Sequence, residues 1–222
     1  MSTKKQIVYN ILNILEAGRI HDDFVPSYYQ LSYIIDYKRA KYIRQDQTKN
    51  YFDTDQFYQD LGVINMVKVD KAECSQLSLD CDVLRSEIPI PNVMRLNFRL
   101  GLKISAIDKQ TRFTIVLPER SPFLGNTKFP QLGVKVYWLN GYLYIPESCD
   151  IRAINVRGLL ETPKTASTFV CSGESCYTDD SNYPLTSDLE DLIVKDILSN
   201  ELRGLMTIVP DEENDGNDNN TR

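Results

Sequence analysis

The chain has 222 residues, of which 42% are hydrophobic and 25% are charged, and its formal net charge is −6. Such a chain forms one large domain or two small ones, and its composition is that of an ordinary globular protein. No apolar run approaches the roughly 18 residues that a membrane-spanning helix needs. Polar residues at helical spacing (Asn10, Asn13 and Glu16) interrupt the apolar N-terminal stretch. We therefore expect a helix of a non-secreted protein there, rather than a signal peptide.

The charge is unevenly distributed. The last twelve residues, 211–222, carry five acids and one arginine, so the rest of the chain is near −2. Residues 1–50 carry eight lysines and arginines against five acids. This mild bias is far from the strongly basic face of a dedicated nucleic-acid binder. The acidic tail has too few apolar groups to fold by itself, and we predict that it is disordered.

Capping boxes mark the start of two N-terminal helices. In each, a hydroxyl residue precedes a glutamine by three positions: Thr3 with Gln6, and Ser27 with Gln30. Apolar residues at helical spacing follow both boxes. We predict that the first helix ends at Gly18 and the second near Lys49. A short third helix is predicted from Asp53 to Gly62.

The middle of the chain alternates with a period of two, as strands do. Hairpins are predicted around Asp108-Lys109-Gln110 and around Asn140-Gly141, a dipeptide that adopts the positive φ angles of a type I′ turn. Strands are expected at 63–69 and 151–160. The prolines of the segment 87–91 make it extended. These features predict an antiparallel β part of about five strands.

The predicted fold class is α+β, with N-terminal helices, an antiparallel β middle and a C-terminal helix. The segments 118–131 and 163–186 are predicted to be long loops, the second of them polar and mobile. The expected divisions are a helical part (1–62), the β part (63–162), the polar loop (163–186), the C-terminal helix (187–210) and the acidic tail (211–222).

The predicted C-terminal helix starts at Ser187 and carries a narrow apolar stripe on a polar background. This stripe needs a cover. It packs either on the chain's own β part or, as a candidate assembly helix, on a neighbouring subunit. Its residues are Leu189, Leu192, Ile193, Ile197 and Leu202.

No catalytic or metal-binding constellation is evident. His21 is the only histidine, and it lies in a predicted link between helices. There is no glycine-rich phosphate loop and no nucleophile motif, so we expect no enzyme, no cofactor and no metal. The five cysteines have irregular spacing, which favours a reduced setting over a disulfide framework. Cys171 and Cys176 are close enough to pair or to bind a metal, although one histidine and no C-x-x-C motif make zinc a poor candidate.

The second helix carries a mixed basic and aromatic cluster with three interpretations. It is a DNA-facing surface, a protein interface, or a helix whose basic side chains lie over an apolar face with their charges in water. The candidate residues are Tyr37, Lys38, Arg39, Lys41, Tyr42 and Arg44.

Three parts of the chain form a recognisable combination. The first is Gly18-Arg19-Ile20-His21-Asp22-Asp23, followed by a capped helix that carries Lys38-Arg39-Ala40 and Arg44-Gln45-Asp46-Gln47. The others are the block 133–163 and a C-terminal helix followed by Ile208-Val209-Pro210 and an acidic tail. Together these segments resemble a class of virion structural proteins in crAss-like, short-tailed bacteriophages.

The resemblance implies a neck or tail ring protein, a subunit of the collar that connects the portal to the tail and surrounds the DNA channel. Such rings are commonly twelvefold. The implied partners are other copies of the chain, the portal protein and other neck and tail proteins, with genomic DNA passing nearby and no membrane. The implied location is the virion, after assembly in the host cytoplasm. A nucleic-acid-binding accessory protein acting through the helix at 27–49 is the alternative.

Overall fold

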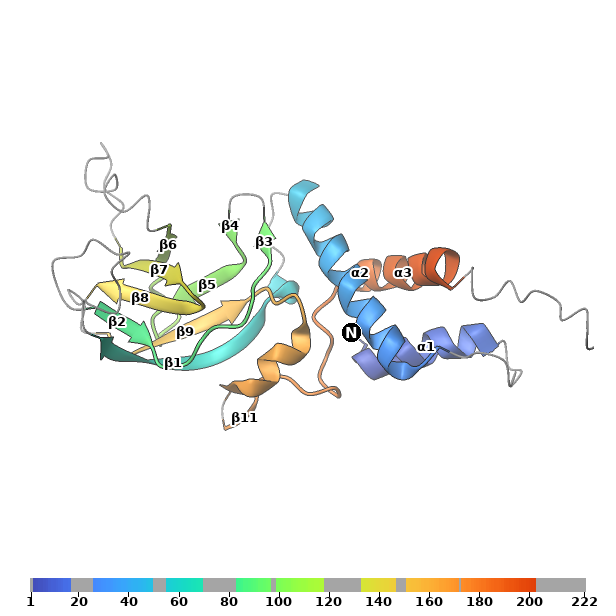
Figure 1. Ribbon diagram of the computed structural model, residues 1–222, viewed down its shortest axis with the longest axis horizontal. Coiled ribbons are helices and arrows are strands. Elements are labelled where there is room, and N and C mark those ends of the chain that lie inside the picture. The colour runs from blue at the N-terminus through green and yellow to red at the C-terminus, as the bar shows by residue number, and fades with distance from the viewer. Residues whose placement is uncertain are drawn as a thin grey trace, which may run out of the picture.

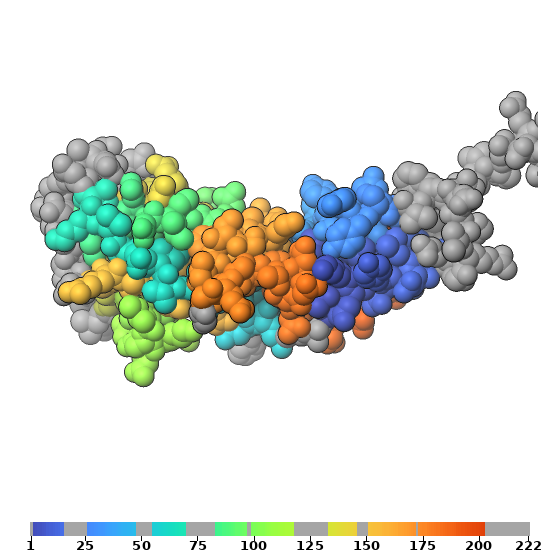
Figure 2. All heavy atoms as spheres, turned by 90° about the horizontal axis from the view of Figure 1, so that it is seen from below, coloured from blue at the N-terminus to red at the C-terminus, as the bar shows by residue number. Residues whose placement is uncertain are grey.

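The computed structural model is elongated, with a β unit at one end and a helical unit at the other (Figure 1). Figure 2 shows the same elongation from below. In the part of the chain that the structure describes, the helical unit consists of three helices drawn from both ends of the chain, and the β unit contains the strands between them. The structure describes residues 2–16, 26–49, 55–69, 83–96, 99–117, 133–146, 151–171 and 173–202.

Both capping boxes form as the sequence predicts. The Thr3 amide donates to Gln6 Oε1 at 2.8 Å, and the Gln6 amide donates to Thr3 Oγ1 at 3.2 Å. The reciprocal bonds between Ser27 and Gln30 are 3.0 and 3.3 Å long. The helices are α1 (Lys4–Glu16), α2 (Tyr28–Lys49) and α3 (Ser187–Asp196), which continues as a π-helical turn, η5 (Ile197–Glu201).

The β unit is built on one seven-stranded sheet in the order β5-β9-β1-β2-β8-β7-β6. All neighbours are antiparallel except β6 and β7, which are parallel. Its strands are β1 (Gln59–Val69), β2 (Val83–Ser86), β5 (Leu102–Ser105), β6 (Thr114–Val116), β7 (Lys135–Leu139), β8 (Tyr142–Pro146) and β9 (Ala153–Gly158). Two small hairpins add β3 (Arg95–Leu96) with β4 (Arg99–Leu100), and β10 (Val170–Cys171) with β11 (Glu174–Ser175).

The long strand β1 joins the two halves of the sheet. Its first part pairs with β9 and its last part with β2, so one strand runs through both halves of a curved sheet, which encloses the main apolar core (Figure 1). Both halves contribute apolar side chains to that core, as their period-two patterns require. Among these are Ile64, Leu84, Ile104, Val136, Leu143, Ile145, Ile154 and Val156.

The Asn140-Gly141 hairpin is confirmed. Asn140 has φ 49° and Gly141 has φ 81°, and they connect the antiparallel strands β7 and β8. The predicted turn at Asp108-Lys109-Gln110 also forms, with Lys109 at φ 60°. The strand after it differs from the expectation, because β6 leaves this hairpin and pairs in parallel with β7. The strand β2 was not predicted.

The predicted helix ending at Gly62 is wrong. Of the described residues 55–62, the first three form a 3-10 turn, η1 (Asp55–Phe57), and Gly62 lies inside β1 at a shift in its register with β9. Gly62 has φ +74°, and a Cβ there would lie 2.4 Å from the carbonyl oxygen of Val170. Gly62 therefore does not end a helix. A glycine is needed at this position because the bulge has a positive φ and because β10 approaches the backbone closely.

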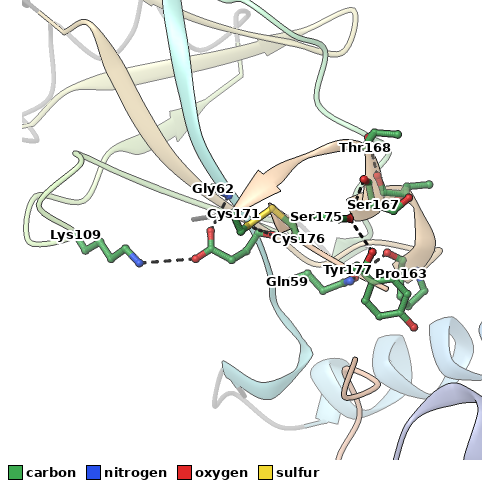
Figure 3. The surroundings of a disulfide bond; sticks show 12 residues. Gln59, Gly62, Lys109, Pro163, Ser167, Thr168, Cys171, Ser175, Cys176 and Tyr177 are labelled. Atoms are coloured by element: carbon green, nitrogen blue, oxygen red, sulfur yellow. Dashed lines mark hydrogen bonds and ion pairs between the residues drawn. A yellow bond between two sulfur atoms is a disulfide. The ribbon is translucent and has the colours of Figure 1, made fainter. Parts of the chain in front are cut away.

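The segment 163–186 is also more regular than predicted. It begins with a 3-10 helix, η4 (Pro163–Thr168), and continues into the β10–β11 hairpin, which the Cys171–Cys176 disulfide closes (Figure 3). The expectation of reduced cysteines is therefore wrong for this pair. The segment packs on the β unit through Ala166, Phe169 and Tyr177, which are buried.

Polar contacts hold this segment in place (Figure 3). The Gln59 side-chain amide donates to the carbonyl oxygen of Pro163 at 3.1 Å. The Ser175 hydroxyl lies 2.9 Å from the carbonyl oxygens of both Ser167 and Tyr177. The segment 163–186 has the composition of a loop, but its few buried apolar residues and these hydrogen bonds give it an ordered structure.

Some predictions fall outside the described residues. They concern His21, the loop at 118–131, the end of the C-terminal helix beyond Leu202 and the acidic tail 211–222.

Candidate functional site

The helix α2 has two opposed faces with different roles. Its inner face packs against α1 and α3, and Leu31, Ile35 and Ile43 on it are fully buried. Phe57, Met94 and Leu159, which come from the near end of the β unit, join the same core. The inner face therefore holds the helical unit together and attaches it to the β unit.

Arg39 is the central residue of this attachment. Its side chain is completely buried and donates hydrogen bonds to the carbonyl oxygens of Leu160, Pro184 and Phe57, at 2.8, 3.0 and 3.3 Å. The guanidinium carbon lies 5.7 Å from the centre of the Tyr183 ring. Burial lowers the pKa of Arg39. Phe57 precedes β1, Leu160 follows β9 and Pro184 precedes α3. This one side chain therefore connects α2 to the three segments that lie between the helical unit and the β unit.

Lys38 is buried beside α3. Its Nζ forms ion pairs with Asp196 Oδ2 at 2.9 Å and Glu201 Oε1 at 2.6 Å. Burial alone would lower the pKa of Lys38, but hydrogen bonds to Glu201 and Asp196 outweigh it and raise this pKa. These contacts anchor α3 and its final turn to α2.

A third buried polar contact links α1 to α2. Asp36 accepts a hydrogen bond from Lys4 Nζ at 2.8 Å and another from the Tyr183 hydroxyl at 2.7 Å. Because Tyr183 precedes α3, the first and last parts of the described chain meet at one carboxylate of α2.

The predicted surface cluster is therefore split. Lys38 and Arg39 lie inside the subunit, so a DNA-facing or interface role is wrong for these two residues. Tyr37, Lys41 and Arg44 are exposed, and Tyr42 is half-buried. Nor are the exposed cations isolated, because Arg44 pairs with Glu161 and Lys41 Nζ lies 5.7 Å from the centre of the Tyr42 ring.

The outer face of α2 carries a feature that the sequence analysis missed. Tyr29, Tyr33 and Tyr37 recur every four residues, and they are 83%, 72% and 60% exposed. We call these three residues the tyrosine stripe. Residues four apart lie on one face of a helix, so the spacing itself was the available signal. Large aromatic rings with polar hydroxyls, gathered on one exposed face, are typical of protein interfaces.

The apolar stripe of the C-terminal helix is mostly internal. Ile193, Ile197 and Leu202 are buried in the core shared with α1 and α2, and Leu189 packs against that core. Only Leu192 is exposed, at 44%. The prediction of an assembly helix is thus corrected for the buried members, which lie in the core of the same chain, together with the N-terminal helices and the near end of the β unit.

A groove of about 690 Å³ runs between α1 and α3. Its lining combines amide, acidic and apolar side chains, and Ile14 among them is 53% exposed. The lining residues are Asn10, Asn13, Ile14, Glu190, Asp191, Val194, Lys195, Leu198 and Ser199.

Within the described residues, histidine, cysteine and acidic side chains form no group that could hold a metal ion. None of the described helices is long and apolar enough to span a membrane. What the described part of the chain offers is a pair of outward-facing helical surfaces, the tyrosine stripe and the α1/α3 groove.

These features define an α+β subunit with surfaces suited to assembly. A family model described as phage tail ring protein 2 matches residues 6–220, and the chain belongs to this family of crAss-like phage proteins. It is therefore a structural protein of the virion and part of a ring in the phage tail. A search of curated proteins finds no match.

Proposed function

We propose that this chain is a non-enzymatic subunit of a closed ring in the phage neck or tail, which joins the portal to the tail and surrounds the DNA channel. About twelve copies would form the ring, assembled in the host cytoplasm. The match to the tail ring family over residues 6–220 carries the proposal.

The tyrosine stripe supports an assembly role. Its three rings contribute little to the chain's own core, because each is more than half exposed. Exposed aromatic clusters of this kind mark sites where another protein binds. A ring subunit has a use for such a surface, whereas an isolated monomer does not.

The internal use of the basic residues weakens the alternative of a nucleic-acid-binding protein. Lys38 contacts two carboxylates and Arg39 contacts three carbonyls, so neither is available to a phosphate. A subunit that surrounds a channel does not need them, because the genome has to pass without binding tightly.

Phage that cannot make this chain tests the proposal. We expect such phage to yield heads that lack tails, and expression of the unaltered chain in the host to restore complete particles. A fused tag on the complementing chain should then be found at the neck or tail by electron microscopy. Complete infectious particles without the chain would contradict the proposal, as would a monomer whose main property is salt-sensitive affinity for DNA.

A further inference from the structure

A closed ring of identical subunits requires two different surfaces on each subunit. Each copy contacts its neighbours head-to-tail, so one surface of a subunit has to fit a second surface of the next copy. The helical unit carries one such pair: the tyrosine stripe on α2, and the groove between α1 and α3. Because these belong to different helices, both are open on the same subunit at once.

The tyrosine stripe is a projecting surface with hydrogen-bond donors and positive charge. The hydroxyl groups of Tyr29, Tyr33 and Tyr37 stand on rings that rise from the outer face of α2. On the same face, one turn beyond Tyr37, Lys41 is exposed. The exposed charges on this face of the described helix are Lys41 and Arg44, both basic, although Arg44 also pairs with Glu161.

The α1/α3 groove is a recess with acceptors and negative charge. Glu190 and Asp191 line it on α3, and Asn10 and Asn13 line it on α1. The α3 carboxylates that face α2, chiefly Asp196, are already neutralised by Lys38. Among the described residues no ion pair joins Glu190 or Asp191 to α2, and Lys195 is the one basic residue of the lining. Ile14, Val194 and Leu198 supply apolar surface for an aromatic ring.

We propose that the tyrosine stripe of one copy docks into the α1/α3 groove of the next copy, so that the helical units form the continuous belt of the ring. The shapes agree, since a ridge meets a recess. The chemistry also agrees, because phenol hydroxyls and Lys41 meet amides and carboxylates while the rings cover the exposed Ile14. This inference rests on the proposed function, in that it takes the ring to consist of copies of this chain.

Other occupants of the stripe give different results in the same experiment. Two stripes packed against each other would form a symmetric pair, which does not use the groove. A protein of a neighbouring ring on the stripe would leave contacts between copies of this chain unchanged. The test therefore has to show which surface meets which.

Cross-linking in assembled particles provides that test. Phage lacking the chain is complemented with a variant that carries Tyr33→Cys and Asn13→Cys together, both at exposed positions. A short bismaleimide is added to purified particles, and the chain is followed on a denaturing gel. We expect a ladder of dimers, trimers and larger multiples. Particles with either substitution alone control for the native cysteines and should give no ladder.

The contrary outcomes are distinct. Dimers from Tyr33→Cys alone would show stripe-to-stripe contact, and a product with a different virion protein would show another ring on the stripe. Either result overturns the proposed docking, and so does the absence of a ladder in particles that contain the chain. Absence of the chain from complete particles would instead contradict the proposed function.

A second measurement uses variants that each lose one surface. The stripe variant carries Tyr29→Ser, Tyr33→Ser and Tyr37→Ser, and the groove variant carries Asn13→Lys and Asp191→Lys. We expect that neither variant alone restores tails, and that both expressed together also fail, since every ring then contains defective junctions. In purified form the two should bind each other in a one-to-one complex, because each retains the surface that the other lacks. If either variant bound to itself as strongly as the two variants bind to each other, the proposed docking would be contradicted.

Matched control variants separate these effects from changes in charge or apolarity. Asn92→Lys with Glu174→Lys makes the same charge change on exposed sites of the β unit. Ile107→Ser with Val170→Ser removes exposed apolar side chains there. Both controls should restore tails as the unaltered chain does. Loss of tails with these controls would show that the ring depends on general surface properties and not on the stripe and the groove.

Discussion

The β unit and the helical unit are stabilised in different ways. The core of the β unit is made of apolar side chains enclosed by a curved sheet, and its shape depends on close backbone approach at Gly62. The core of the helical unit includes the buried charges of Lys4, Lys38 and Arg39. The difference shows that a cluster of basic residues on a helix can serve to fasten distant parts of one chain. Neighbouring positions on the same helix then remain free for assembly.

The largest effect should come from Arg39→Met. The substitution keeps the bulk of the side chain but leaves the carbonyls of Leu160, Pro184 and Phe57 without their donor. Buried acceptors without partners are costly, so we expect a loss of about 3–5 kcal/mol in the free energy of unfolding, measured with urea. Arg44→Met, on the exposed face of the same helix, is the control and should cost less than about 1 kcal/mol. Equal losses from both would mean that Arg39 does not fasten the two units.

The second effect concerns the backbone of the β unit. Gly62→Ala places a methyl group 2.4 Å from the Val170 carbonyl oxygen at a residue with φ +74°. We expect a loss of about 2–3 kcal/mol in unfolding free energy. Gly173→Ala provides the comparison, since Gly173 has φ +92° but nothing lies within 4 Å of its added Cβ. It should cost about 1 kcal/mol. If both variants lose the same amount, the close approach of β10 to β1 is not important for stability.

The third effect is a dependence on pH. Burial raises the pKa of Asp196, but hydrogen bonds from Lys38, Asn200 and Tyr42 outweigh it and lower this pKa to about 2. A lowered pKa stabilises the folded chain above the ordinary value of 3.8, and this contribution disappears as the pH falls toward 2. Asp196→Asn should therefore be less stable than the unaltered chain by about 2 kcal/mol at pH 6. The gap should close near pH 2 in urea titrations at several pH values, and a gap independent of pH would contradict the contribution of this ion pair.

The smallest effect on stability should come from the tyrosine stripe. Tyr33→Ser removes a side chain that is 72% exposed, so unfolding free energy should change by no more than about 0.5 kcal/mol. Incorporation of the chain into particles should nevertheless fall. Urea unfolding of the purified variant measures the first quantity, and the amount of the chain in purified particles measures the second. A large loss of stability would place Tyr33 in the fold and remove the contrast between the two faces of α2.

Local chemistry made parts of the fold predictable. The capping boxes at Thr3 and Ser27 and the Asn140-Gly141 turn depend on residues that are adjacent in the chain, and all three form as expected. The α+β class follows from the change in periodicity after the N-terminal helices. The family resemblance was also confirmed.

The errors have a common physical cause in contacts between distant segments. The local sequence around Gly62 is typical of a helix end, but its structure is set by the close approach of β10. The local sequence around Lys38 is typical of a surface cation, but its burial depends on Asp196 and Glu201, which are distant in the sequence. The segment 163–186 has a loop-like composition, yet it is ordered by packing on the β unit. The tyrosine stripe could have been found from its four-residue spacing, whereas the α1/α3 groove depends on the placement of two helices that no local pattern specifies.

The most direct measurement is an electron cryomicroscopy reconstruction of the neck and tail in purified phage particles. We expect a closed ring of copies of this chain around the DNA channel, with the outer face of α2 covered by the next copy. Tyr29, Tyr33 and Tyr37 would then lie against α1 and α3 of that copy. A tail without such a ring would contradict the central claim, and so would a ring whose tyrosine stripes face solvent.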